Sequence, residues 1–135
     1  MFTVEKAGAA LIHVEIGGRI TAEEMSQGLD TLLPMIAGMQ DAAMRMVYHD
    51  VGLPELGAVM EEMKRLPQLF GALGHVKRVA VLSDAKWIRD MAELEGMVLP
   101  GTTIRGFPTG ETASAEQFLS GEPLDDPMDD ENFPV

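Results

Sequence analysis

Residues 78–88 read RVAVLSDAKWI, and this stretch of the chain decides the fold class. Residues 79–82 form a short continuous apolar run, which is typical of an inner strand of a parallel sheet. Ser83 and Asp84 follow directly, and both residue types favour the N-cap position of a helix. A buried strand that passes straight into a helix predicts an α/β domain.

Outward from this stretch, strands and helices alternate along the chain. Strands are predicted over residues 2–6, 10–16, 43–51, 79–82 and 102–107. Helices are predicted after Thr21, after Pro54 with an apolar stripe that extends to Phe70, after Asp84, and over residues 113–119. The helix after Asp84 has Trp87, Met91, Leu94 and Val98 at helical spacing, so we expect these side chains to face the core.

The connections predict how these elements are arranged. The first two strands are joined by a short turn and are expected to pair antiparallel. Right-handed crossovers between neighbouring parallel strands would place every helix on one face of the sheet. The sequence therefore predicts an α/β fold with a single-wound, mostly parallel five-stranded sheet, an antiparallel first strand and four helices.

Polar side chains alternate with apolar ones in the second and third strands. His13, Glu15, Arg45 and His49 share one side of this alternation and would be costly to bury, so we expect them on an open face of the sheet. Two imidazoles and a carboxylate are suitable ligands for a divalent metal. The sequence does not fix their mutual register, however, so a hydrated or interface cluster is the favoured interpretation and we predict no metal site.

Composition narrows the function classes. The chain has 135 residues, which fits one domain, and it has no cysteine, which excludes disulfides and thiol chemistry. Ten basic and 22 acidic residues give a formal charge of -12, which disfavours binding to nucleic acid. No apolar run approaches the ~20 residues of a membrane span, and no secretory signal is visible. We expect a cytoplasmic protein without a cofactor.

Acidic residues are concentrated at the end of the chain. No Lys or Arg follows Arg105, whereas eight carboxylates do. We therefore divide the chain into a domain over residues 1–120 and an acidic tail over residues 121–135. The tail is expected to dock on its own body or on a neighbouring subunit. The basic residues that its carboxylates can reach are Lys77, Arg78, Lys86, Arg89 and Arg105.

Residues 78–88 also resemble the fourth-strand-to-third-helix signature of the SpoIIAA-like proteins. These proteins are a branch of the STAS superfamily, and their fold is also compared with the Sec14 (CRAL-TRIO) lipid-binding lobe. Residues 18–21 and 32–34 resemble the first helix of that family, and residues 105–108 resemble its last strand. The resemblance extends from about residue 2 to residue 119.

The resemblance implies a non-enzymatic role. The better-studied STAS relatives are anti-sigma-factor antagonists, which bind a partner kinase through the loop after the third strand and the following helix. They are switched by phosphorylation of a Ser or Thr in that loop. The matching loop here, residues 50–55, retains Asp50 and Gly52 but contains no Ser or Thr. The expected function is an interaction or regulatory module without this switch, which binds a protein partner or forms a homodimer. The alternative is a Sec14-like domain that binds an apolar small ligand.

The candidate binding residues lie where strands end, because ligands of α/β sheets sit beyond the carboxyl ends of the strands. The helix N-terminus there can hold a small anion. The competing interpretation is that Ser83 or Asp84 caps the helix, Trp87 packs in the core and Lys86 is solvated. The candidate residues are Asp50, Gly52, Ser83, Asp84, Lys86 and Trp87.

Overall fold

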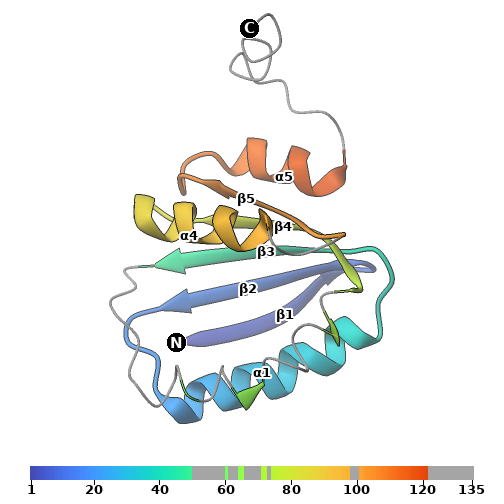
Figure 1. Cartoon of the computed structure of the whole chain (residues 1–135), viewed down its shortest axis with the longest axis vertical. Helices are drawn as coiled ribbons and strands as arrows, with labels where there is room; N and C mark the ends of the chain where they lie inside the picture. Colours follow the sequence, from blue (N-terminus) through green and yellow to red (C-terminus); the bar gives the residue numbers. More distant parts are fainter. Residues whose placement is uncertain (50–59, 61–63, 66–70, 73, 98–100, 122–135) are drawn as a thin grey trace, which may run out of the picture.

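The computed structural model of the chain describes residues 1–49, 60, 64–65, 71–72, 74–97 and 101–121. Within them the chain forms a five-stranded sheet whose spatial order, β1-β2-β3-β4-β5, is also the order of the strands along the sequence (Figure 1). The strands are β1 (Phe2–Gly8), β2 (Leu11–Gly17), β3 (Ala42–His49), β4 (Val76–Leu82) and β5 (Thr103–Phe107).

Strand directions agree with the prediction. β1 pairs antiparallel with β2 across a tight turn, and β2, β3, β4 and β5 are all parallel. A turn of two residues can join only antiparallel neighbours, whereas each parallel pair needs a crossover. The chain is thus an α/β domain with a mixed sheet, as the alternating apolar patterns indicate.

The first helix, α1 (Ala22–Ala37), begins at the predicted capping box. The backbone N–H of Glu24 donates to the Thr21 hydroxyl at 3.1 Å, and the Glu24 carboxylate accepts from the Thr21 backbone N–H at 3.2 Å. The same carboxylate lies 3.0 Å from the amino group of Met1, which ties the start of β1 to this helix. The helix continues past Pro34 and ends at Gly38.

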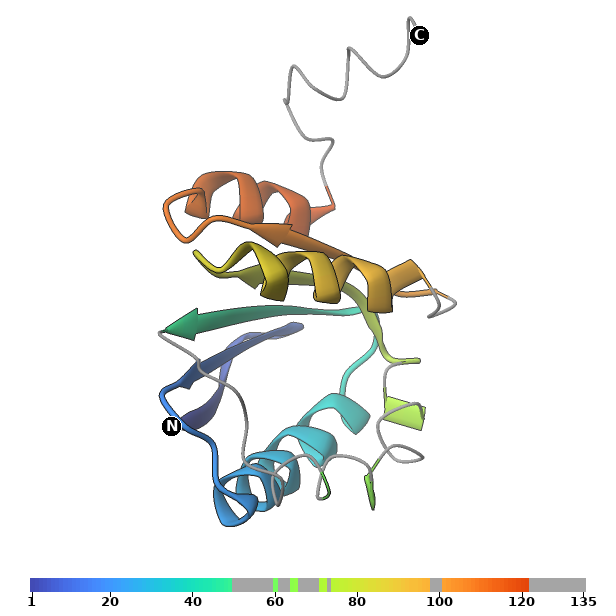
Figure 2. The same ribbon diagram turned by 60° about the vertical axis from the view of Figure 1, so that its left-hand side comes forward.

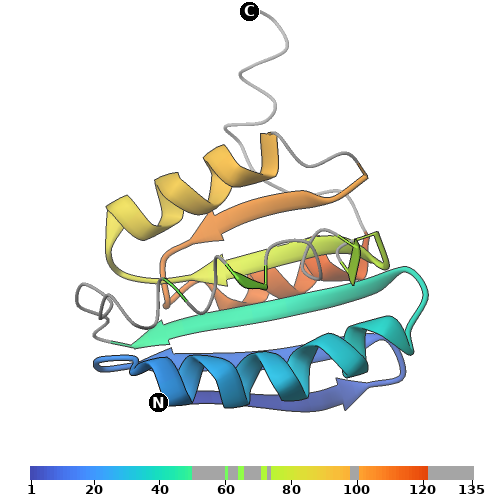
Figure 3. The ribbon, with the colours of Figure 1, turned by 60° about the horizontal axis from the view of Figure 1, so that its bottom comes forward.

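The main core lies between one face of the sheet and the helices α1 and α4 (Lys86–Met97), which are in front of the sheet in Figure 3. Alternate residues of the inner strands supply this face, as period-two patterning requires. Ile36 of α1 and Ile88 of α4 pack against it. The strand residues of the core include Ile12, Val14, Ile16, Met44, Val79 and Val81.

The last helix, α5 (Thr112–Ser120), lies on the opposite face of the sheet (Figures 2 and 3). The prediction that every helix shares one face is therefore wrong for α5. The crossover rule constrains a helix between two parallel strands, and α5 follows the last strand, so nothing in the rule fixes its side. A second, smaller core forms there from Ala80, Leu82, Phe107, Ala115, Phe118 and Leu119.

The described residues contain three helices where the sequence predicts four. The fourth is expected from Leu53 to Phe70, a range of which the structure describes only residues 60, 64 and 65. None of the described helices is long and apolar enough to cross a membrane.

Candidate functional site

Ser83 stabilises the turn between β4 and α4. It is 2% exposed, and its hydroxyl accepts a hydrogen bond from the Ala85 backbone N–H at 3.1 Å. Its carbonyl oxygen accepts from Nη1 of Arg89 at 2.7 Å. A hydrogen bond from a backbone N–H to the hydroxyl of a serine two residues earlier is typical of a local turn. The side chain is therefore engaged at the start of the helix and does not point into an open site.

Asp84 joins this turn to the one that follows β5. Its Oδ1 accepts hydrogen bonds from the hydroxyl of Thr109 at 2.6 Å and from the Thr109 backbone N–H at 3.3 Å. These bonds stabilise the charged form, and they hold the pKa of the Asp84 carboxyl below its usual value. The carboxylate is thus a structural link across the C-terminal ends of β4 and β5.

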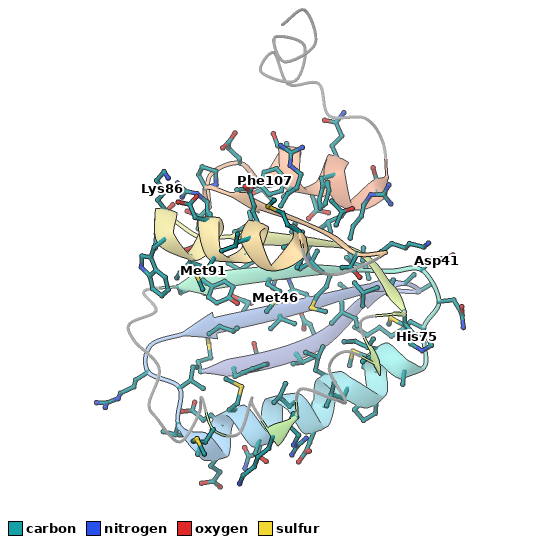
Figure 4. The ribbon with its side chains drawn as sticks, viewed as in Figure 1. Asp41, Met46, His75, Lys86, Met91 and Phe107 are labelled. Atoms are coloured by element: carbon teal, nitrogen blue, oxygen red, sulfur yellow. The ribbon has the colours of Figure 1, made fainter. Side chains whose placement is uncertain are left out.

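Lys86 lies at the exposed start of α4 (Figure 4), and its Nζ is 2.7 Å from Oδ2 of Asp90, one turn along the helix. Among the described residues, no hydrogen bond or ion pair joins Lys86 to Ser83 or Asp84. Asp50 and Gly52, the two loop candidates, lie outside the described residues. The four described candidates therefore form a turn and a helix start, and their polar groups do not converge on one point.

Trp87 does not pack in the core, and the prediction that its stripe faces inward is wrong. Trp87, Met91 and Leu94 are 51%, 50% and 58% exposed, whereas Ile88 is 7% exposed. We call Trp87, Met91 and Leu94 the α4 stripe. Val98, the fourth residue of the predicted core face, lies outside the described residues.

Close packing against β5 explains why the α4 stripe faces away from the sheet. A Cβ added to Gly106 of β5 would lie 2.6 Å from Cβ of Arg89, and one added to Gly96 of α4 would lie 2.8 Å from Cβ of Ile104. Glycines let backbones approach this closely. Apolar residues recur at helical spacing on both faces of α4. The periodicity alone therefore does not show which face the glycines bring against the sheet.

A polar network lies on the second face of the sheet, where the alternation in β2 and β3 predicts polar side chains. The carboxylate of Glu15 lies between two imidazoles: its Oε1 is 2.8 Å from Nε2 of His49, and its Oε2 is 3.1 Å from Nε2 of His13. The hydrogen bonds from His49, and secondly those from His13, hold the pKa of Glu15 below its usual value. No group of His, Asp or Glu in the described chain is arranged to hold a metal ion.

Arg45 extends this network to α5. Its Nε donates to Nδ1 of His13 at 2.8 Å, and its Nη1 pairs with Glu116 of α5. Because Nδ1 of His13 accepts this bond, the ring carries its proton on Nε2 and donates it to Glu15. The sequence places Arg45 on this face, but the contact with Glu116 depends on the side of the sheet that α5 occupies, for which the sequence has no signal.

A groove of about 450 Å³ runs beside α1. Ligand binding between helices and sheet, as the Sec14-like alternative expects, would need lining residues from the strands. Among the described residues, the groove is lined only by α1 and by residues between 65 and 75. They are Leu29, Asp30, Leu33, Pro34, Ala37, Arg65, Gly71, Ala72 and His75. Figure 4 shows His75 beside the right-hand, C-terminal end of α1, where its Nδ1 is 2.9 Å from the Met39 carbonyl oxygen.

The family model of the SpoIIAA-like proteins matches residues 11–120. This range includes strands β2 to β5 and the three described helices. The chain belongs to the SpoIIAA-like family. A solved structure of an uncharacterized protein of the DUF3478 family with a SpoIIAA-like fold, from Shewanella loihica PV-4, superposes with a TM-score of 0.63. The two sequences are 18% identical, and the match covers 88% of this chain and 92% of the other. It shows that the two proteins share a fold. No curated protein matches the chain.

Proposed function

We propose that this SpoIIAA-like domain is a non-enzymatic interaction module that binds a protein partner through the α4 stripe. The observation that carries the proposal is the exposure of Trp87, Met91 and Leu94, each about half exposed, at positions i, i+4 and i+7 of one helix. Neighbouring large apolar side chains that stay exposed mark interaction sites. Tryptophan is also enriched among the residues that dominate binding energy at protein interfaces.

The shape of this surface favours a protein over a small molecule. A helix presents a convex ridge, and anchors at i, i+4 and i+7 suit an apolar groove on a partner protein. Small molecules bind instead in concave sites that bury most of their surface. Completing the burial of three half-exposed side chains is worth about 1 kcal/mol each, so the stripe would raise the affinity for a partner by roughly a hundredfold.

Two polar groups of the turn support a non-enzymatic role. The hydroxyl of Ser83 is buried and hydrogen-bonded to the backbone, and Asp84 is held by Thr109. A nucleophile needs an adjacent base and an open approach for the substrate. The buried Ser83 hydroxyl has neither feature, and the Asp84 carboxylate already accepts two hydrogen bonds from Thr109, so the turn serves to position α4.

Phosphorylation does not control the proposed interaction through the loop after β3. Residues 50–55 read DVGLPE and contain no hydroxyl side chain that could be phosphorylated as in the STAS relatives. The proposed module therefore binds without the charge switch of that family. Its affinity is set by the α4 stripe, and its occupancy by the concentration of the partner.

The test is photo-crosslinking from α4 in cells of the source organism. A benzophenone amino acid at position 91 should give adducts with one defined protein, and Trp87→Ala together with Leu94→Ala should abolish them. The same group at position 111, at the start of α5, is the matched control and should give no such adduct. Adducts that are equally strong from both positions, or that survive the double substitution, would contradict the proposal.

The groove beside α1 supports a second candidate function, the binding of an apolar small ligand. Most of its described lining is apolar, including Leu29 and Leu33 of α1. Native mass spectrometry of the purified chain would reveal a retained ligand as added mass. That mass should disappear when Leu33→Trp fills the groove, and its persistence would place the ligand elsewhere.

A further inference from the structure

Two arginines lie beside α5 on the second face of the sheet, and this face is opposite the α4 stripe. The register pairs Arg78 with Thr103 and Ala80 with Arg105, so Arg78 and Arg105 are diagonal neighbours on β4 and β5. Residues that are two apart on a strand share a face. Arg78 and Arg105 therefore lie on the same side as Ala80, which packs under α5.

Arg78 sits against the end of α5. The helix ends at Gly121, whose φ of 85° is left-handed, and a Cβ added there would lie 3.3 Å from Nη1 of Arg78. The C-terminus of a helix carries partial negative charge, which favours a guanidinium at this place. The chain therefore leaves the described domain directly beside this cation.

Arg105 lies over the aromatic pair of the second core. Its Cζ is 5.7 Å from the ring centroid of Phe107 and 6.0 Å from that of Phe118. Contacts of a guanidinium with ring faces at this range are attractive and hold the side chain in place. The guanidinium is thus fixed beside α5, and its donors make no hydrogen bond with the described residues.

Neither Arg78 nor Arg105 has a carboxylate partner in the described part of the chain. Two other described arginines have a carboxylate partner: Arg45 of β3 pairs with Glu116 of α5, and Arg65 pairs with Asp30 of α1. Both unpaired side chains are partly buried. A partly buried cation with a carboxylate close by is more stable than one without.

We propose that the acidic segment, residues 122–131 of the same chain, docks on Arg78 and Arg105. The segment follows Gly121 directly, so it starts beside Arg78. Neighbouring strands are about 4.8 Å apart, and four or five extended residues span about 13–18 Å, so the carboxylates that follow Glu122 reach Arg105 as well. The carboxylates of the segment are Glu122, Asp125, Asp126, Asp129, Asp130 and Glu131.

Covalent attachment favours this segment over any free anion. A short flexible tether keeps the carboxylates at an effective concentration in the millimolar range. Nucleic acid is disfavoured as an occupant because the chain carries a formal charge of -12. The docked segment covers the sheet beside α5, and an acidic partner would have to displace it. This inference does not depend on the function proposed for α4.

A spin label on the full-length chain tests the docking. The chain has no cysteine, so Met128→Cys provides a unique site for a nitroxide. Docking predicts strong paramagnetic broadening of the backbone amide signals of Arg105, Phe118 and Gly121. The broadening at Arg105 should fall about fivefold in the Arg78→Gln, Arg105→Gln variant, as expected when two partly exposed charge pairs are lost. Raising the salt concentration should have a similar effect.

Lys6→Gln with Lys86→Gln is the charge-matched control, because both lysines are exposed and neither shares the surface of Arg78 and Arg105: Lys6 is on β1 at the other edge of the sheet, and Lys86 is on α4, which packs on the opposite face from α5. It should leave the broadening unchanged. Neutralising the four aspartates at 125, 126, 129 and 130 tests the same contacts without altering the described domain, and it should release the label even if the arginine variant fails to fold. Broadening centred on α4 would overturn the proposal, and so would broadening that stays unchanged in the arginine variant or in the aspartate variant. So would broadening transferred to unlabelled chains in a mixed sample, which would identify a second copy as the occupant.

Discussion

Arg45 of β3 donates a hydrogen bond through Nε to Nδ1 of His13, its direct neighbour on β2, at 2.8 Å. This bond fixes the tautomer of His13, whose other nitrogen then donates to Glu15. Through Glu116 the same guanidinium reaches α5. One side chain thus links the polar half of the second face to the helix that covers the other half.

Replacing Arg45 should loosen this link. Arg45→Met removes a charge-assisted pair and leaves Nδ1 of His13 without its donor, so we expect the free energy of unfolding to fall by about 1–3 kcal/mol. Urea denaturation at neutral pH measures the loss. A double-mutant cycle with Glu116→Gln should show coupling of about 0.5–1 kcal/mol between the two sites. Simple additivity of the two substitutions would contradict the link to α5.

Glu15 should make the stability of the domain depend on acidic pH. The hydrogen bonds from His49 and His13 hold the pKa of Glu15 below its ordinary value of about 4.3 in the folded state. A carboxyl whose folded pKa is depressed contributes stability that is complete above the unfolded pKa and is lost as the pH falls through the folded pKa. The stability difference between the natural chain and Glu15→Gln should therefore shrink on acidification below about pH 5.

The measurement is urea unfolding of both proteins across this pH range. Glu111→Gln is a suitable control, because Glu111 is exposed and its side chain makes no capping hydrogen bond at the start of α5. A constant difference between the natural chain and Glu15→Gln down to the acid limit would show that the imidazoles do not stabilise the Glu15 carboxylate.

Close contact between α4 and β5 should make Gly106 intolerant of a side chain. A Cβ at this position would lie 2.6 Å from Cβ and 3.0 Å from Cα of Arg89, so the backbone of α4 itself would have to move. We expect Gly106→Ala to destabilise the domain by about 1–3 kcal/mol. Gly110→Ala is the matched control, because a Cβ there has no atom within 4 Å and the substitution should be close to neutral. Thermal unfolding compares the two variants.

Local signals in the sequence predict much of this fold. The alternation around His13 and Glu15 places these residues on a polar face, and the capping box at Thr21 marks where α1 begins. The apolar run before Ser83 is an inner strand, as it predicts. These features depend on residues that are close in sequence, so pattern and capping chemistry are sufficient to identify them.

The two wrong predictions concern how a helix packs against the sheet. The side of the sheet that α5 occupies follows from the small core around Phe107 and Phe118, which forms only after the strands are in register. The inward face of α4 follows from Gly96 and Gly106, whose role is to permit close approach between α4 and β5. Packing between elements leaves no periodic pattern within either one for a sequence argument to use.

The outward orientation of the α4 stripe leads to a final prediction. Leu94 is 58% exposed and Ile88 is 7% exposed on the same helix, so truncating the two side chains should have unequal effects. Leu94→Ala should change the free energy of unfolding by no more than about 0.5 kcal/mol, as is usual at exposed positions. Ile88→Ala should cost about 2–5 kcal/mol, because it leaves a cavity in the main core. Chemical denaturation of the two variants measures both effects, and Trp87, the only tryptophan of the chain, reports unfolding by its fluorescence. A loss at Leu94 as large as that at Ile88 would show that the stripe is packed within the domain and would remove the basis for its role in partner binding.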